Sequence, residues 1–186
     1  MIDIERIIRT GIPDIAPVYG GARGRTMSSK HQSYAWEVIV EAGIKRIIDL
    51  RDEDKSERFP RICSHFGLEY FNYPVDNAAT TITRMVELFP QFCEQIDQGD
   101  FYIACAMGLH RTDIALITYW VFHGANNGIA PPAIRGYRQE KGHNTNKIMR
   151  VLNAFYKYKT ERDGKEPMSM EMFKQRKKVI NELSLR

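Results

Sequence analysis

The chain has 186 residues, 43% hydrophobic and 27% charged, which is enough for one well-packed domain and too few for two of ordinary size. Its formal charge of +4 is compatible with acidic substrates but does not indicate nucleic-acid binding, and no zinc-ligand spacing is present. The sequence has no long apolar run and no signal-peptide pattern, and its three cysteines show no disulfide pattern. These features predict a cytoplasmic protein in a reducing compartment.

The first fifty residues alternate turn signals with short apolar segments. A short strand is predicted at residues 16–19. The glycine-rich cluster 20–24 is predicted to be a turn, because it lacks the Gly-Lys-Ser/Thr ending of a nucleotide-binding loop. Apolar residues at helical spacing predict a helix over residues 33–42. Gly43 ends that helix, and a strand follows at residues 45–51.

A charged segment and a further strand come next. Residues 51–58 are predicted to be an exposed loop and helix start, because they are almost all charged. Residues 68–75 predict a strand. Pro74 must lie near its end, since proline cannot donate to a strand ladder.

A long amphipathic helix is predicted after this strand. Thr80 or Thr81 can cap it, and its apolar stripe extends to Ile96. Pro90 lies inside the helix and predicts a kink or a break. Cys93 is predicted to be a core residue rather than a resolving thiol. Cys63 has no assigned role.

The stretch 100–113 carries the most chemical information. Residues 101–104 are apolar and follow a Gly-Asp turn signal, as is typical of a buried strand, and residues 113–123 have the length and hydrophobicity of a helix. Between strand and helix lie Cys105, then five residues that include Gly108, and then Arg111 and Thr112.

A helix N-terminus that follows a strand and a tight loop is a suitable binding site for a phosphate. Backbone N–H groups and the helix dipole favour an anion there, and Gly108 lets successive N–H groups converge on it. Arg111 adds a planar two-pronged donor. The same positive field favours the nucleophilic thiolate of Cys105, to which Thr112 can donate its hydroxyl. His110 either adds a pH-dependent donor or is a neutral loop residue bonded to the backbone.

At these residues the chain resembles the cysteine-dependent protein tyrosine phosphatase superfamily, in particular its small dual-specificity branch. The family signature is His-Cys-x2-Gly-x2-Arg followed by Ser or Thr, and this chain matches it from Cys105 to Thr112. The family's His, which normally helps to hold the loop and to favour the thiolate, is replaced by Ala104. The resemblance implies that the phosphate is bound by Ala106, Met107, Gly108, Leu109, His110 and Arg111.

The resemblance also implies a general acid on the loop after strand 68–75. Asp76 lies there, 29 residues before Cys105. A carboxylic acid at this point can protonate the leaving oxygen and then act as a base toward water. The alternative is a turn-forming aspartate, since the residues around it also suit turn and cap chemistry. Asp52 and Asp54 are weaker competitors for the acid role.

The segment after the signature is predicted to be helical. Pro131 and Pro132 can start a helix that runs through residue 138, residues 142–144 break it, and Thr145 caps the next helix. An arginine-rich helix, then a turn and another helix, is similar to the segment after the signature in the dual-specificity branch.

Three polar residues of this segment are further candidates. Arg135 and Arg138 could meet a second phosphate, although a surface or ion-pair role is favoured. Asn144 could position water or backbone near the site.

The C-terminal residues are predicted to be a linker and a helix. Residues 160–170 have linker composition, and residues 171–185 have an apolar face. The basic run from Lys174 to Lys178 could contact a membrane or a polyanion. Four basic residues favour instead a solvated face on a docked helix.

The whole pattern predicts an α/β fold with a central four- to five-stranded, mostly parallel sheet flanked by helices, of the phosphatase type. Residues 1–160 are predicted to form a single catalytic domain, and residues 161–186 a linker and helical extension. The predicted function is hydrolysis of a phosphorylated protein or small phosphoester through a phosphocysteine, with no metal or organic cofactor and no nucleic-acid partner.

Three alternatives remain open. An inositol phosphate or phosphoinositide substrate is disfavoured because residues 106–110 contain no lysine. An inactive module that captures phosphorylated ligands is supported only by Ala104. Sulfur or arsenate transfer on a similar loop would not use Asp76.

Overall fold

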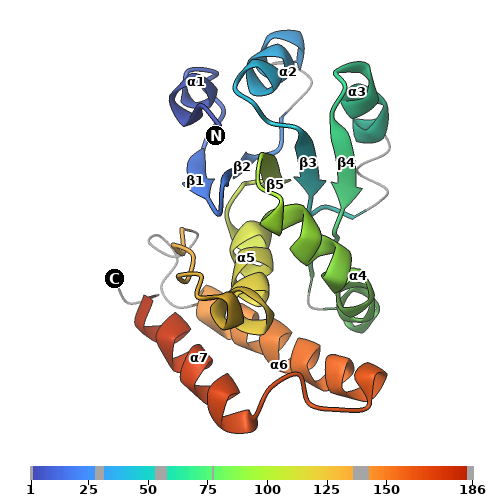
Figure 1. Ribbon diagram of the computed structural model, residues 1–186, viewed down its shortest axis with the longest axis vertical. Coiled ribbons are helices and arrows are strands. Elements are labelled where there is room, and N and C mark those ends of the chain that lie inside the picture. The colour runs from blue at the N-terminus through green and yellow to red at the C-terminus, as the bar shows by residue number, and fades with distance from the viewer. Residues whose placement is uncertain (1, 28–31, 53–57, 77, 136–142, 184–186) are drawn as a thin grey trace. The chain divides into compact units, whose positions relative to one another are not determined.

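The computed structural model describes residues 2–27, 32–52, 58–76, 78–135 and 143–183, and its chain divides into two compact units (Figure 1). The first unit contains residues 1–74 and 90–112, and the second contains residues 75–89 and 113–186. The predicted domain boundary at residue 160 falls inside one long helix, and the division into a catalytic domain and an extension stays a prediction.

The first unit contains a five-stranded sheet, as predicted. Its strands are β1 (Ala16–Val18), β2 (Gly21–Arg25), β3 (Arg46–Asp49), β4 (Glu69–Asn72) and β5 (Phe101–Cys105). Their order is β1-β2-β5-β3-β4, and only the β1–β2 pair is antiparallel. All residues of β3 and β5 are buried, as expected for central strands of a parallel sheet. The mostly parallel α/β prediction is therefore confirmed.

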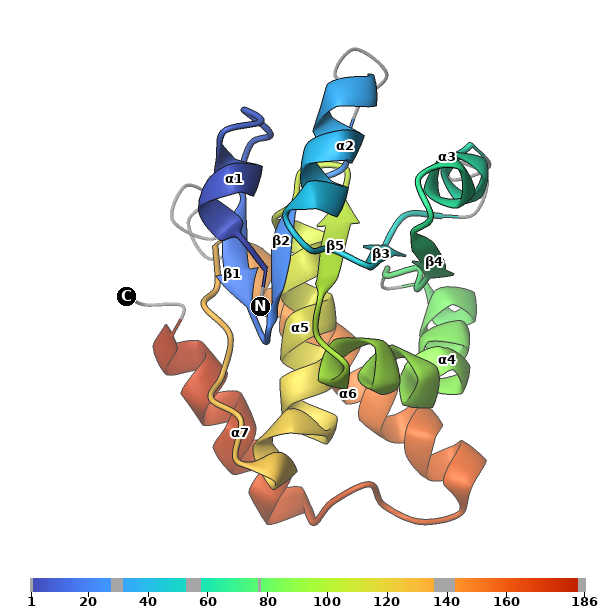
Figure 2. The same ribbon diagram turned by 45° about the horizontal axis from the view of Figure 1, so that its top comes forward.

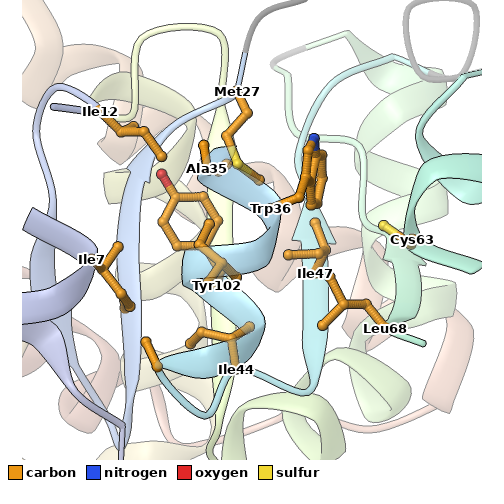
Figure 3. Close-up of a cluster of buried hydrophobic side chains, with 14 residues drawn as sticks. Ile7, Ile12, Met27, Ala35, Trp36, Ile44, Ile47, Cys63, Leu68 and Tyr102 are labelled. Carbon is orange, nitrogen blue, oxygen red and sulfur yellow. The ribbon is translucent and has the colours of Figure 1, made fainter. Parts of the chain in front are cut away.

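Three helices cover one face of this sheet, namely α1 (Ile4–Ile8), α2 (Gln32–Glu41) and α3 (Phe59–His65) (Figures 1 and 2). Their apolar side chains meet the strands in a single buried cluster, in which Trp36, Ile47 and Tyr102 lie between α2 and the sheet (Figure 3). Trp36 also joins α2 to α3 through an edge contact with Phe59, at 5.7 Å between ring centroids. The sequence pattern did not predict α1, which Asp3 caps by accepting from the Arg6 N–H at 3.0 Å.

The glycine-rich cluster 20–24 was predicted to be a turn, and this is wrong for all but its first residue. Gly20, with φ +76°, makes the turn, whereas residues 21–25 form β2 beside β5. These glycines allow close packing. A Cβ at Gly21 would lie 2.6 Å from the Phe101 carbonyl oxygen, and a Cβ at Gly24 would lie 2.3 Å from the Tyr102 hydroxyl. The pattern signals contact between neighbouring strands rather than a reversal of the chain.

Strand β4 is shorter than predicted, because it ends at Asn72 and leaves Pro74 beyond it. The long helix that follows, α4 (Ala79–Asp97), is continuous, so of the kink or break predicted at Pro90 the break is wrong. Proline has no N–H to donate to the Val86 carbonyl four residues earlier. That carbonyl instead accepts a hydrogen bond of 2.6 Å from the Arg162 guanidinium. The missing helical bond is thus replaced.

The second unit is built from helices around aromatic side chains. It contains the first part of α4, most of α5 (His110–Phe122), the short 3-10 helix η3 (Gly124–Asn127), α6 (His143–Asp163) and α7 (Met170–Leu183). Phe155 on α6 lies 4.9 Å from Phe89 and 4.7 Å from Phe122, measured between ring centroids. Phe173 on α7 stacks on Tyr156 at 4.6 Å. The predicted C-terminal helix is therefore present.

Two predictions for the second unit are wrong. Residues 131–135 are not helical, because their backbone turns back to α5, where the Arg135 N–H donates to the Asp113 carboxylate at 3.2 Å. The next helix, α6, begins at His143, so position 145 lies inside it and not at its predicted start. The rest of the predicted 131–138 helix lies outside the described residues. The predicted linker is shorter than expected, because α6 continues to Asp163.

Two cations of the C-terminal basic run make contacts inside the second unit. Arg176 donates to the Asn126 side-chain oxygen at 2.6 Å, and Lys177 to that of Asn153 at 2.9 Å. Within the described ranges, no helix combines the length and the apolar character needed to cross a membrane.

Candidate active site

The predicted phosphate loop follows the central strand of the first unit. Cys105 is the last residue of β5 and is 3% exposed. Residues 106–109 form the loop, and α5 begins at His110, so Arg111 lies in the first turn of a helix. Ala106 and Met107 are exposed, whereas Leu109 and His110 are half-buried. The sequence prediction of strand, loop and helix N-terminus is confirmed. We call residues 105–111 the signature loop.

The thiol of Cys105 lies beside a buried hydroxyl. Thr112 is fully buried, and its Oγ1 donates to Cys105 Sγ at 3.4 Å. A hydroxyl held at this distance can stabilise negative charge on sulfur. The predicted Thr112–Cys105 pairing is therefore present in the structure.

Gly108 has a structural reason to be glycine. Its φ is +69°, in the left-handed region, and its N–H donates to the Cys105 carbonyl at 3.1 Å. A Cβ here would lie 2.4 Å from the Gly24 carbonyl carbon and 2.5 Å from the Arg25 nitrogen. The signature loop therefore rests directly on the backbone of β2, which the sequence did not predict.

Arg23 of β2 is a contact that the sequence analysis missed. Its side chain is 2% exposed, and its Nη2 donates to the Gly108 carbonyl at 3.1 Å and to the Leu109 carbonyl at 3.4 Å. The signal that could have found it is the alternation in Arg-Gly-Arg, which puts both arginines on one face of a strand. The turn interpretation of residues 20–24 hid that alternation.

The C-terminal end of β2 also holds the start of the signature loop. The Thr26 N–H donates to the Cys105 carbonyl at 2.9 Å, and Arg25 Nη2 approaches Met107 Sδ at 3.7 Å. Tyr102 donates its hydroxyl to the Arg25 carbonyl at 2.8 Å. Burial raises the pKa of Tyr102, so its hydroxyl keeps the proton that it donates.

Arg111 is paired with a carboxylate in the resting structure. Its Nη2 lies 3.6 Å from Asp52 Oδ2, and the two side chains are 23% and 41% exposed. The turn that carries Asp52 is fixed by the buried Asp49, which accepts from Arg51 at 2.7 Å. Asn72 completes this turn by donating to the Asp49 and Arg51 carbonyls.

Asp76, the predicted general acid, belongs to the second unit. Its Oδ1 lies 3.5 Å from Lys147 Nζ on α6, and both side chains are about one-third exposed. The Asp113 carboxylate is buried, and it accepts a hydrogen bond from the Arg135 backbone N–H. Asp54 and Arg138 lie outside the described residues, as does the side chain of Asn144.

The remaining cysteines are core residues. Cys63 and Cys93 are both buried and free of disulfides. Burial, with a smaller contribution from Asp49, raises the pKa of Cys63 to about 12. In the part of the chain that the structure describes, no group of acidic, histidine or cysteine side chains could hold a metal ion.

The family comparison agrees with this geometry. Residues 21–151 match the model of the family described as DSP-PTPase phosphatase fused to NAD+ kinase. The chain belongs to this family. The match begins at β2, so the strand that supports the signature loop is part of the family domain. None of the curated proteins compared with the chain matches its sequence.

Two crystal structures of one bacterial protein share the fold of this family member. A DUF442 protein from Shewanella putrefaciens CN-32 aligns in two crystal structures, at 18% and 16% identity with TM-scores of 0.59 and 0.58. These alignments cover 84% and 85% of this chain and 99% and 98% of the other. The core catalytic domain of the PP-IP phosphatase SIW14 from S. cerevisiae aligns at 13% identity and a TM-score of 0.49, over 82% of this chain and 94% of that one.

Proposed function

We propose that this member of the DSP-PTPase family hydrolyses phosphomonoesters through a phosphocysteine intermediate, with phosphorylated tyrosine, serine or threonine side chains as its substrate class. The observation that carries the proposal is the position of Cys105. Its sulfur accepts a hydrogen bond from the Thr112 hydroxyl. Cys105 is the last residue of parallel strand β5, shortly before the N-terminus of α5. Anions bind at such points because N–H groups and the helix dipole converge there.

The first chemical step forms a bond from sulfur to phosphorus and breaks the phosphorus–oxygen bond to the leaving group. Arg111 and the loop amides bind the phosphoryl oxygens and stabilise the charge on them in the transition state. Asp76 gives its proton to the leaving alkoxide or phenoxide.

In the second step, water attacks phosphorus and the sulfur leaves as thiolate. Asp76 takes the proton of that water, and Thr112 stabilises the sulfur as it departs. Inorganic phosphate then dissociates. Neither step requires a metal or an organic cofactor.

Ala104 favours a second candidate function, a binding module that captures phosphorylated ligands without turning them over. The family's His is missing at this position, so the loop depends on other residues for support. Cys105, Arg111 and Asp76 are all present, which favours the enzyme.

The test is steady-state hydrolysis of p-nitrophenyl phosphate between pH 5 and 8. Cys105→Ser should abolish turnover, whereas Cys93→Ser, a matched change at another buried cysteine, should not. Asp76→Asn should lower kcat by roughly 10²- to 10⁴-fold and flatten the basic limb of the pH profile. Lys147→Gln removes the cation beside Asp76 but keeps the carboxyl group, so it should keep most of the activity.

Absence of turnover in the wild type at every pH would contradict the enzyme. In that case, binding of a phosphotyrosine peptide, lost in Arg111→Ala, would support the binding module. Turnover of inositol phosphates far faster than of phosphopeptides would keep the chemistry but overturn the proposed substrate class. Activity that survives Asp76→Asn unchanged would remove Asp76 from the mechanism.

A further inference from the structure

Arg23 is a buried cation in direct contact with the signature loop. It is 2% exposed, and its Nη2 donates to two consecutive loop carbonyls, those of Gly108 and Leu109. Burying a guanidinium is costly unless its donors are satisfied by hydrogen bonds. Both hydrogen bonds come from β2, the strand whose backbone Gly108 touches.

The contact with Arg23 fixes not only two carbonyl groups of the loop but also the direction of two N–H groups. In a trans peptide the C=O of one residue and the N–H of the next point in opposite directions, and the described chain has no cis peptide bond. Holding the Gly108 and Leu109 carbonyls toward Arg23 therefore directs the N–H groups of Leu109 and His110 away from it. N–H groups held in a fixed direction are what a phosphate loop requires.

The strand register puts Arg23 on the face that carries the nucleophile. Arg23 pairs with Ile103 and Arg25 pairs with Cys105 in the parallel β2–β5 ladder. Side chains alternate along a strand, so Arg23 shares its face with Cys105, whereas Ala104 projects into the apolar cluster on the other face. The residue directly before the cysteine offers only a methyl group to hold the loop.

We propose that Arg23 is the positioning residue of the signature loop, taking from the neighbouring strand the loop-holding role for which Ala104 has no donor. It acts through the backbone of residues 108–110 and does not touch the substrate. The proposal rests on the proposed phosphatase function.

The test compares two buried arginines that each hold a carbonyl. Arg46 on β3 is 7% exposed and donates to the Gly99 carbonyl at 2.8 Å, before β5 begins rather than where it ends. Arg23→Met and Arg46→Met should both lower the urea midpoint of unfolding. Only Arg23→Met should lower kcat/KM for p-nitrophenyl phosphate, and raise the inhibition constant of inorganic phosphate, each by roughly 10- to 100-fold.

Arg23→Lys keeps the test decisive if Arg23→Met does not fold. It retains a charge and donors but loses the planar fork, so the inhibition constant of inorganic phosphate should still rise above that of the wild type. Equal phosphate inhibition constants for the Arg23 variants and wild type would overturn the positioning role, as would equal changes in the Arg46 control. A wild type that neither turns over nor binds phosphate would overturn the proposed function itself.

Discussion

Arg23 contacts the signature loop and Arg111 belongs to it, and the two arginines differ in what surrounds them. Arg23 is almost fully buried and donates to backbone carbonyls, whereas Arg111 is 23% exposed and faces the carboxylate of Asp52 at 3.6 Å. A partly exposed ion pair of that kind contributes about 0–1 kcal/mol to stability, so a phosphate can displace it at little cost. A buried cation fixes the shape of the loop, and an exposed cation with a weak partner stays available to a ligand.

The largest effect that separates the two arginines is expected from Arg111→Lys. Lysine keeps the charge but loses the two-pronged donor matched to phosphate oxygens, so kcat/KM should fall by roughly 100- to 1000-fold. The free energy of unfolding should change by less than about 1 kcal/mol, because the Asp52 pair is partly exposed. Kinetics and urea unfolding on the same preparation measure both. A large loss of stability would place Arg111 with Arg23 as a structural residue.

Gly108→Ala tests whether the loop really rests on β2. The new Cβ would lie 2.4 Å from the Gly24 backbone at a φ of +69°, so both stability and activity should fall. The matched control is Gly67→Ala, which has a φ of +67° and nothing within 4 Å. The control should cost about 1–2 kcal/mol and leave kcat/KM unchanged. Equal losses of stability in the two variants would show that β2 shifts to accommodate the new Cβ, and that the signature loop does not pack tightly against it.

Asp52→Asn is expected to have a modest effect. Removing the carboxylate releases Arg111 to the phosphate, so KM should fall or stay the same and kcat should change less than about tenfold. The ionic-strength dependence of KM should also weaken, because a competing charge is gone. A fall in kcat on the order of 10²-fold or more would instead make Asp52 the general acid in place of Asp76.

The smallest expected effect is on the reactivity of the Cys63 thiol. Burial, followed by the charge of Asp49, raises the pKa of Cys63 to about 12, so its thiol stays protonated at pH 8. Iodoacetamide should not modify Cys63 in the native protein at that pH and should do so after unfolding in urea. Peptide mass spectrometry reads out the modified positions. Native modification of Cys63 would show that its surroundings open on the time scale of the reaction.

The sequence alone was sufficient for those parts of the site that are contiguous in the chain. The strand ending at Cys105, the loop, the turn at Gly108 and the helix that carries Arg111 and Thr112 follow from periodicity and residue chemistry within residues 101–122. The order of strands and the partners of the loop do not follow from that stretch. They depend on contacts between β2 and residues 80 to 86 positions further along the chain.

Arg23 shows why the long-range part was missed. From the sequence alone, the glycines beside Arg23 indicate a flexible turn, because glycine is favoured both in turns and where two backbones come close together. Only the presence of Tyr102 and Phe101 against those glycines distinguishes the two cases. Pro90 is the opposite case: of the kink or break predicted there, the break does not occur. Its lost hydrogen bond is real, and the replacement comes from Arg162, which no local pattern can reveal.

The contact between Gly108 and β2 has a consequence for folding. Arg23 and Gly108 are 85 positions apart in the chain, so the loop acquires its support only after a parallel, non-local strand pair has formed. Such pairs form late, because the entropy of closing a long loop must be lost before their contacts are gained. Recovery of catalytic activity during refolding therefore reports docking of β2, rather than formation of the helices or collapse of the core.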